Sequence, residues 1–509
     1  MKNKYLFSRG KTYALLLATG TLLWGSCAIG YDSPNGFDVG VSDTQMETPK
    51  QITFAISVDG TFAKIGWPLV VGAKGYEVSI YNVDDPENPV IVDDYEKKVI
   101  DGCSITVPVT EDSKYKLELR ALGNEAYGNK DDEAPMVYNL STLVPSVATI
   151  PNGSDIYTYL QEHPLPAVSD EEVAIDLEAD GVYTCSGPID FGGQKMTFRG
   201  DKLKRAVVNM TGKGSFYSFT GLKIKYINFD CSESSANSFI FMSAGTDMVD
   251  GKATLPDSIK SENLGYARNG ELIKDIYIVR DPVYISNCWI KDLPKSMIHD
   301  NEINCAWWYF TITNCIIQQR NKGSDPFINL QKKGKCIKHI DINNSTIYNV
   351  EDSKGYWLRY NNSSNSNVQK VFGNTTSDHS TASVDFYRCT FCKTYSKQKM
   401  ANNNNGTGMS TTMTHCIFYD IKQIRSLSAM GVKKFGFNFY YAYTSPDNAD
   451  PTQKDNSGTP FASVYDPKFA GDITLSLDFT QPNAGVNFTP QEREVIVNSS
   501  GDPRWLPTY

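Results

Sequence analysis

The sequence lacks several motifs that would identify common classes of enzyme and of nucleic-acid-binding protein. It has no P-loop, no Rossmann glycine pattern and no GxSxG nucleophile elbow. Its five His residues show no spacing typical of metal ligands. Beyond the first 27 residues no stretch approaches 18 consecutive apolar residues, which argues against a membrane-spanning helix. With 49 Lys and Arg against 58 Asp and Glu, the net charge of −9 makes nucleic acid an unfavourable partner.

The composition that remains is that of a soluble, folded protein, with 40% hydrophobic and 12% aromatic residues. At 509 residues the chain is too long for one ordinary core, so we expect several domains or a solenoid. Eleven Cys residues would suggest a disulfide framework in an exported protein. Four of them, however, recur at one position of a repeat, where a free Cys would pack as a small hydrophobe.

An eight-residue pattern of alternating apolar and polar residues occurs five times in the second half of the chain. The copies are VYISNCWI (Val283–Ile290), FTITNCII (Phe310–Ile317), IDINNSTI (Ile340–Ile347), VDFYRCTF (Val384–Phe391) and TTMTHCIF (Thr411–Phe418). Period-2 alternation predicts strands, and self-similarity every 20–50 residues is typical of a solenoid. The repeated position holds Cys288, Cys315, Ser345, Cys389 and Cys416. If Cys288 faces the interior, alternation directs Trp289 outward and Ile290 inward.

The first 26 residues read as a signal peptide with a lipid attachment point after it. Basic residues precede the apolar stretch Tyr13–Trp24, and Leu-Trp-Gly-Ser then leads to Cys27. This ending resembles a bacterial lipobox, although Trp24 stands where Leu is usual; the alternative is an ordinary cleaved signal followed by a chance Cys. The resemblance implies lipidation at Cys27 and a location in the cell envelope, anchored to the outer membrane and exposed at the surface. Residues 27–48, rich in Gly, Ser, Asp and Pro, predict a flexible tether.

Residues 49–145 contain several short alternating runs separated by turn residues, which predict a β-sandwich. Trp67-Pro68, followed by Tyr76 and by the run Tyr115–Ala121, resembles the pattern of a fibronectin type III domain. In that family the Trp packs in the core and the later Tyr begins the penultimate strand. The resemblance implies a spacer or binding module, and the segment contains no cluster of catalytic residue types.

Residues 146–440 contain the repeats, and their first strands resemble the N-terminal coils of pectate-lyase-like right-handed parallel β-helices. The segment Asp155–His163 predicts a short helix that caps the open end of the solenoid. Polar insertions, such as residues 233–280, predict long loops that leave the coils. We therefore expect an all-β chain: a fibronectin type III-like sandwich, then a right-handed parallel β-helix with loop insertions. Residues 441–509 lose the period and predict an irregular segment that closes the solenoid.

The ending Gly501–Trp505, together with the tandem organisation upstream, resembles uncharacterised domain families of Bacteroidetes surface lipoproteins. Those families pair fibronectin-like units with β-helices and are linked to polysaccharide utilisation. The resemblance implies a polysaccharide as the main partner, an outer-membrane glycan transporter complex as a second one, and membrane contact through the lipid anchor only.

Aromatic and basic side chains are the candidates for polysaccharide contact, because rings stack on sugars and polar groups bind hydroxyls. The predicted ligand-binding residues are Trp289, Trp307, Trp308, Tyr309, Trp357, Arg359 and Tyr360. The alternative is that these aromatics fill the core or pad the turns between coils. A basic string that could contact uronates, or could simply be a solvated turn, consists of Lys332, Lys333, Lys335, Lys338 and His339.

A polysaccharide lyase would need a base for the C5 proton and a cation to stabilise the developing enolate. The residues that could supply this chemistry are Lys295, His299, Arg320 and Asp292, with Ca²⁺ as a cofactor only in this case. The paired Asp ligands and the Arg-x-Pro-x-x-Arg segment of pectate lyases have no match. Our leading interpretation is therefore a lipoprotein that binds polysaccharide along a β-helix face without catalysis or cofactor. A uronate-specific polysaccharide lyase and an adhesin or structural surface protein are the alternatives.

Overall fold

The computed structural model describes residues 41–242, 257–293, 295–300, 305–330, 336–351, 355–360, 371–372, 382–395, 400–402, 409–421, 432–441 and 454–507. The predicted signal peptide and Cys27 lie outside these residues. The chain divides into two compact units, Met1–Val144 and Pro145–Tyr509. Within the described ranges no helix is both long enough and apolar enough to cross a membrane.

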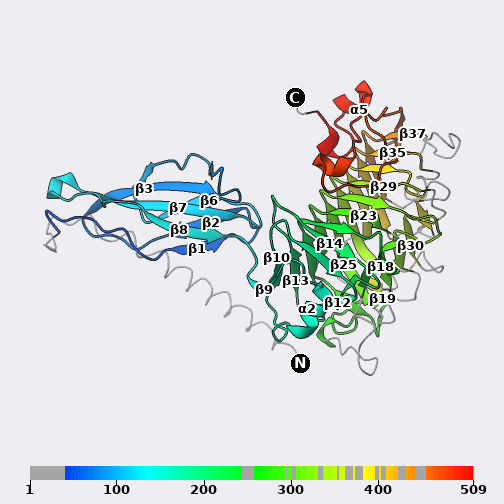
Figure 1. Cartoon of the computed structure of the whole chain (residues 1–509), viewed down its shortest axis with the longest axis horizontal. Helices are drawn as coiled ribbons and strands as arrows, with labels where there is room; N and C mark the ends of the chain where they lie inside the picture. The colour runs from blue at the N-terminus through cyan, green and yellow to red at the C-terminus, as the bar shows by residue number, and fades with distance from the viewer. Residues whose placement is uncertain are drawn as a thin grey trace, which may run out of the picture. The chain divides into compact units, whose positions relative to one another are not determined.

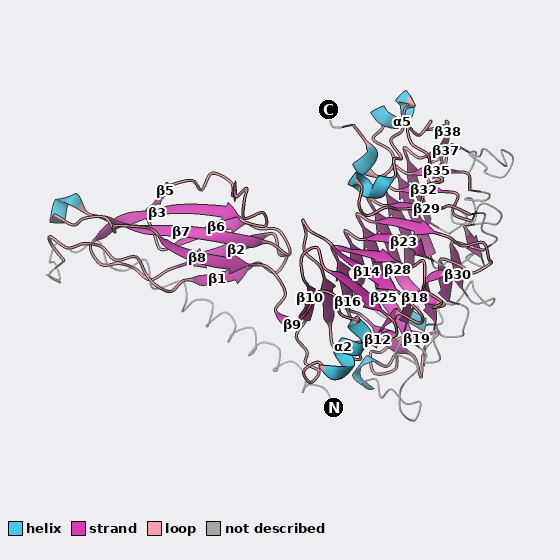
Figure 2. Cartoon of the chain, viewed as in Figure 1, coloured by secondary structure: helices cyan, strands magenta, loops and turns pink. Residues whose placement is uncertain are grey.

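The N-terminal unit contains two antiparallel sheets that enclose a shared core (Figure 2). One sheet consists of β1 (Thr53–Ile56), β2 (Phe62–Gly66) and β6 (Ser104–Pro108). The other consists of β3 (Ala73–Asn82), β4 (Val90–Ile91), β5 (Lys98–Ile100), β7 (Lys114–Gly123) and β8 (Met136–Ser141). Trp67 packs edge-on against Tyr76 in this core, with ring centroids 5.4 Å apart. The expected β-sandwich is thus present, while its assignment to the fibronectin type III family stays a prediction.

The C-terminal unit is a parallel β-helix whose coils contribute one strand to each of up to three sheets (Figure 1). The first sheet contains β9 (Ser146–Ile150), β10 (Val173–Leu177), β13 (Met196–Arg199), β16 (Leu222–Lys225), β21 (Tyr277–Val279), β22 (Val283–Ser286), β25 (Cys305–Thr313), β28 (Ile337–Asn343), β31 (Ala382–Tyr387), β34 (Met409–Thr414) and β36 (Val432–Gly436). The second contains β11 (Val182–Cys185), β14 (Ala206–Met210), β17 (Ile227–Asp230), β23 (Trp289–Leu293), β26 (Ile316–Gln319), β29 (Thr346–Asn349), β32 (Thr390–Cys392), β35 (Ile417–Tyr419), β37 (Phe439–Tyr441) and β38 (Ser463–Val464). The third contains β12 (Pro188–Asp190), β15 (Ser215–Ser218), β18 (Ser238–Met242), β24 (Ser296–Asp300), β27 (Ile328–Leu330), β30 (Leu358–Tyr360) and β33 (Ala401–Asn402). Parallel pairing between successive coils confirms the predicted right-handed parallel β-helix.

The corner between the first and second sheets is built in the same way in every repeat copy. One residue with positive φ makes the turn, and it is Asn287, Asn314, Asn344, Arg388 or His415. The next residue points inward and is Cys or Ser. Each Cys of this column donates through Sγ to the carbonyl two residues earlier at 3.3 Å, and Ser345 Oγ does so at 2.6 Å. Each of these carbonyls also accepts a backbone N–H from the preceding coil, so the small side chain supplies it with a second, local donor.

Burial agrees with the predicted alternation on both sides of this corner. Ile285, Cys288 and Ile290 are fully buried, while Trp289 points outward from the second sheet. All ten described Cys residues are buried and free, which confirms that they pack in the core and form no disulfide framework.

Additional elements cover parts of the coils. Helix α2 (Ile156–Glu162) packs its buried Ile156 at the first coil, with Asp155 as N-cap, and a short hairpin joins β19 (Ala267–Arg268) to β20 (Glu271–Leu272). Residues 465–507, which include α5 (Arg493–Val497), lie along the outward face of the second sheet beside β23 and β29 (Figure 1). We call residues 465–507 the C-terminal cover. The sequence predicted that residues 441–509 close the end of the solenoid. The C-terminal cover instead packs along one side of it, on the second sheet.

Candidate functional site

The outward face of the second sheet is largely occupied by the protein's own C-terminal cover. Trp505, Phe488 and Leu477 pack in one cluster with outward residues of β26, β29 and β32. Trp505 donates through Nε1 to Thr346 Oγ1 at 2.7 Å. Over these coils the second sheet therefore offers no open face to a polymer.

Trp289 points outward as predicted, but it is not an open platform for a sugar ring. The Arg205 guanidinium lies over the ring, 4.6 Å from its centroid. The ring also packs at the margin of the cluster beneath the C-terminal cover. The prediction of a free stacking surface at Trp289 is therefore wrong.

Three other predicted platform residues are also covered. Trp307 and Trp357 are fully buried in the β-helix core, where Trp357 stacks on Phe327 with centroids 5.6 Å apart. Trp308 is nearly buried beneath Lys338, whose Nζ lies 3.8 Å from the ring centroid. The prediction that these three rings stack on sugars is wrong. Burial of a large aromatic side chain in the β-helix is favourable, and it leaves no ring surface for a sugar. The side chain of Tyr360 lies outside the described residues, as do Lys332, Lys333 and Lys335.

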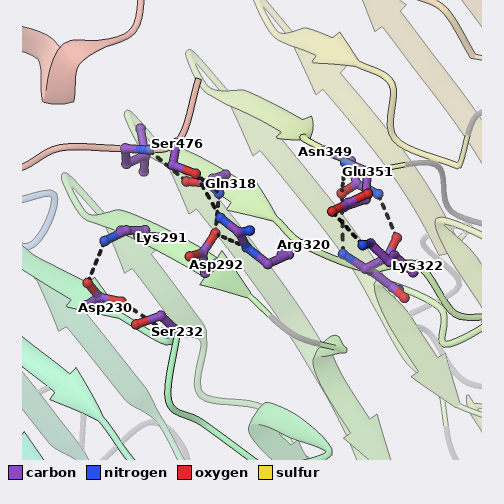
Figure 3. Close-up of polar contacts among 12 residues, drawn as sticks. Asp230, Ser232, Lys291, Asp292, Gln318, Arg320, Lys322, Asn349, Glu351 and Ser476 are labelled. Atoms are coloured by element: carbon purple, nitrogen blue, oxygen red, sulfur yellow. Dashed lines mark hydrogen bonds and ion pairs between the residues drawn. The ribbon is translucent and has the colours of Figure 1, made fainter. Parts of the chain in front are cut away.

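Two of the four lyase candidates pair with each other at the ends of second-sheet strands (Figure 3). Arg320 Nε donates to Asp292 Oδ1 at 2.8 Å, and an Arg320 Nη donates to Ser476 Oγ of the C-terminal cover at 2.9 Å. Gln318 contacts the same Asp292 and accepts from Leu477 N at 2.8 Å. The hydrogen bond that Arg320 donates to Asp292 raises the pKa of Arg320, which is opposite to what a proton-abstracting Arg needs. These residues hold the C-terminal cover in place, and their predicted role in a lyase is not supported.

The other two lyase candidates lie apart from that pair. Lys295 donates to Asn237 Oδ1 at 2.6 Å, beside the third sheet. His299 belongs to a row across the third sheet, with Phe241 on one side and Asn329 and Arg359 on the other. The rings of Phe241 and His299 are 6.0 Å apart. The four lyase candidates therefore do not converge on one reacting centre. His299 shares its row with Arg359, which was predicted as a ligand-binding residue.

The outward face of the first sheet carries the polar positions of the repeat, and these are partly exposed among the described residues. The second position of each copy forms a row in register across five strands, made of Tyr284, Thr311, Asp341, Asp385 and Thr412. These side chains are partly exposed. Strands spaced about 4.8 Å apart place the two Asp side chains directly beside each other.

Two tyrosines and a histidine flank this Asp pair. Tyr309, one of the predicted binding residues, is 40% exposed and stacks on His339 at 5.1 Å between centroids. His339 Nδ1 lies 3.0 Å from Ser383 Oγ on the next strand. Tyr387 lies at the C-terminal end of β31, two strands away from Tyr309, and is 44% exposed. We take these residues with Asp341 and Asp385 as the candidate functional site and call it the open face.

The electrostatics of the open face are dominated by the two carboxylates. Burial, and after it the neighbouring charge of Asp385, together raise the pKa of Asp341 to about 6. Asp385 Oδ1 accepts a hydrogen bond from Thr412 N at 3.0 Å. One carboxyl of the pair can therefore hold a proton close to neutral pH. No group of three or more His, Cys, Asp or Glu side chains suited to a metal occurs among the described residues.

Asp341, Asp385 and Tyr387 were not predicted from the sequence as site residues. The alignment of the repeat copies already contained the signal, because IDINNSTI and VDFYRCTF carry Asp at the same outward position. What the alignment lacks is the information that this outward column stays open while the column of Trp289 is covered.

Two family models match parts of the chain, and both are described as domains of unknown function. One, DUF4992, matches residues 1–182, and the other, DUF4957, matches residues 181–350. No curated protein matches the chain.

Two solved structures align with much of the chain at low scores. Pectate lyase PelI from Erwinia chrysanthemi, in complex with tetragalacturonic acid, shares 10% identity over 71% of this chain and 84% of its own, with a TM-score of 0.15. The family 28 exopolygalacturonase from Yersinia enterocolitica shares 10% identity over 78% of this chain and 75% of its own, with a TM-score of 0.20. Scores this low do not assign an activity, and the fold itself is established by the strand pairings above.

Proposed function

We propose that the β-helix binds polysaccharide along the open face of its first sheet. The observation that carries this proposal is the pair of exposed rings, Tyr309 and Tyr387, on either side of polar side chains of the first sheet. They are two strands and about four residues apart, which corresponds to roughly 16 Å across the sheet. An extended oligosaccharide can bridge this span, with rings stacked on the tyrosines and hydroxyls bound between them.

The charge of the open face favours neutral polysaccharides. Asp341 and Asp385 stand side by side at its centre, and two carboxylates would repel the carboxylates of a polyuronate at pH 7. We therefore expect neutral glycans to bind better than polyuronates at this face.

In this proposal the chain is a lipoprotein attached through Cys27 to the outer membrane and exposed at the cell surface. The N-terminal unit is a fibronectin type III-like spacer, and an outer-membrane glycan transporter is the protein partner. Labelling with radioactive palmitate, compared between the natural chain and Cys27→Ala, tests the anchor. Incorporation that is equal in both proteins would remove the lipid from the proposal.

Affinity electrophoresis of the full chain in gels containing neutral polysaccharides or polygalacturonate tests the binding. We expect retardation in a neutral gel, and a loss of affinity of about tenfold in Tyr309→Ala and in Tyr387→Ala. Tyr127→Ala is the matched control, because Tyr127 is 57% exposed but belongs to the N-terminal unit. Retardation that survives in both open-face variants would refute the proposed face. The absence of retardation in every gel would favour an adhesin or structural role.

A second candidate function is hydrolysis of a glycosidic bond by the Asp pair. The specific observation is that the pKa of Asp341 is raised to about 6 beside Asp385, so one group can donate a proton while the other acts as a carboxylate. New reducing ends released from a bound glycan, and abolished in Asp341→Asn and Asp385→Asn, would support hydrolysis. Unsaturated product absorbing near 235 nm would instead indicate the lyase alternative.

A further inference from the structure

Arg205 differs from Arg320 and Arg504 at the second sheet because it has no carboxylate partner among the residues that the structure describes. It precedes β14, and its guanidinium stacks on Trp289 as described above. One of its terminal nitrogens, Nη1, is buried and has no acceptor among the described residues. By contrast, Arg320 pairs with Asp292 and Arg504 pairs with Asp502 at 2.8–2.9 Å.

The surroundings of Arg205 include a second cation, Arg504. Burial lowers the pKa of Arg205, and the nearby charge of Arg504 lowers it further. Arg504 is itself satisfied, since one terminal nitrogen donates to Asp502 Oδ2 at 2.9 Å and the other to Asn314 Oδ1 at 2.7 Å. The uncompensated cation at this spot is therefore Arg205, and a partly buried cation without a partner is costly.

Two further polar atoms at the same place also lack partners. In the described part of the chain, Trp289 Nε1 is buried without an acceptor and Asn228 Oδ1 is buried without a donor. Asn228 and Trp289 are in register on neighbouring strands of the second sheet. Buried polar atoms are paired in most proteins, so these three atoms around one contact are groups whose hydrogen bonds a bound ligand would supply.

We propose that Arg205, Trp289 and Asn228 form a binding site for an acidic sugar, which presents a carboxylate or a sulfate to the guanidinium. The fork of Arg205 accommodates two oxygens of such a group, and Trp289 Nε1 can donate to an oxygen of the same ligand. Asn228 Oδ1 accepts a hydrogen bond from a sugar hydroxyl. This requirement for an oxyanion and a hydroxyl on one ligand distinguishes an acidic sugar from a simple anion. The site lies on another sheet from the open face and does not rest on the function proposed there.

Calorimetric titration of the full chain tests the site with four probes: a galacturonate oligomer, a sulfated galactan oligomer, a neutral galactan oligomer and sodium sulfate. We expect one of the two acidic oligomers to bind, and binding to weaken at least about tenfold in Arg205→Gln. Lys204→Gln is the matched control, because it removes the same charge one residue away from an exposed side chain and should change affinity less than about twofold. Binding of the galacturonate oligomer would identify the oxyanion as a carboxylate, and binding of the sulfated oligomer would identify it as a sulfate.

Several outcomes would overturn the proposal. They are the absence of binding by either acidic oligomer, equal affinity in Arg205→Gln, and sodium sulfate binding as tightly as the oligomers. If Arg205→Gln unfolds, Arg205→Lys keeps the charge but loses the fork and should still weaken binding several-fold. Tyr309→Ala and Tyr387→Ala should leave the acidic titration unchanged, so that failure here and failure of the open face can be distinguished.

Discussion

The first and second sheets take their outward residues from the same eight-residue repeat, yet one face is open and the other is covered. On the covered side the outward column reads Trp289, Ile316, Thr346, Thr390 and Ile417. On the open side the column reads Tyr284, Thr311, Asp341, Asp385 and Thr412. Both columns contain Thr, so the difference lies in the Trp and Ile of the covered column and the Asp pair of the open one. In this protein another segment of the chain packs on the column with the large apolar side chains.

The largest expected effect on stability comes from removing a side chain that attaches the C-terminal cover to the second sheet. Trp505→Ala deletes a buried ring and its hydrogen bond to Thr346, so we expect a loss of about 3–5 kcal/mol of unfolding free energy. Guanidinium unfolding, followed through the transition of the β-helix, measures it. Tyr387→Ala on the open face is the control and should cost less than about 0.5 kcal/mol. Similar losses in both variants would show that the two faces do not differ as described.

The corner that separates the two faces gives the next largest effect. Ser345→Ala removes the donor to Asn343 O and the acceptor for Cys315 N, at 2.6 and 3.1 Å, and should cost roughly 1–3 kcal/mol. Ser345→Cys restores the donor that the other copies use and should cost distinctly less. Thermal unfolding of the two variants under reducing conditions compares them. An equal loss in both would mean that size, rather than the donor, decides this position.

The smallest effect concerns the charge of the open face. The folded-state pKa of Asp341, about 6, lies above the ordinary value near 3.9, so the folded protein binds more protons between these values. Its stability therefore falls as pH rises from about 4 to about 6. Asp341→Asn removes this loss. We expect the free energy of unfolding of the variant to exceed that of the natural chain by about 1 kcal/mol at pH 7.5, after allowance for solvent screening. At pH 4 the two free energies should be equal.

Denaturant unfolding at the two pH values, with and without 0.5 M salt, measures that difference. Asp502, whose pKa burial also raises to about 6, is present in both proteins and cancels. Salt should reduce the effect because Asp341 is partly exposed. A stability difference that is the same at both pH values would contradict the raised pKa.

The sequence was sufficient to predict the coils, because each repeat copy contains its own alternation. Val283 to Ile290 specify strand, turn, inward Cys and outward Trp within eight residues, and all of these are found. The expected buried thiols follow from the same local pattern. Tyr309, one of the predicted ligand-binding residues, is exposed, and its role in binding stays a prediction.

What the sequence could not predict depends on contacts between distant residues. The C-terminal cover has no periodicity, and Trp505 bonds Thr346, which is 159 residues earlier in the chain. Nothing local to Trp289 shows that Arg205 lies on its ring, and nothing local to Asp292 shows that Arg320 neutralises it. The Asp341–Asp385 pair was visible in the aligned copies. It becomes a candidate site only once the structure shows that both side chains are partly exposed.

The column of thiols also bears on how the protein behaves when it opens. Burial raises the pKa of Cys288, Cys315 and Cys389, so each thiol is protonated and unreactive in the closed coil. A single opening that separates neighbouring coils would expose several thiols together. The rate of alkylation would then report the frequency of that opening, and in an oxidising medium the exposed thiols could cross-link before the coils close. For a protein of this kind, durability is set by the rate of opening as much as by its free energy of unfolding.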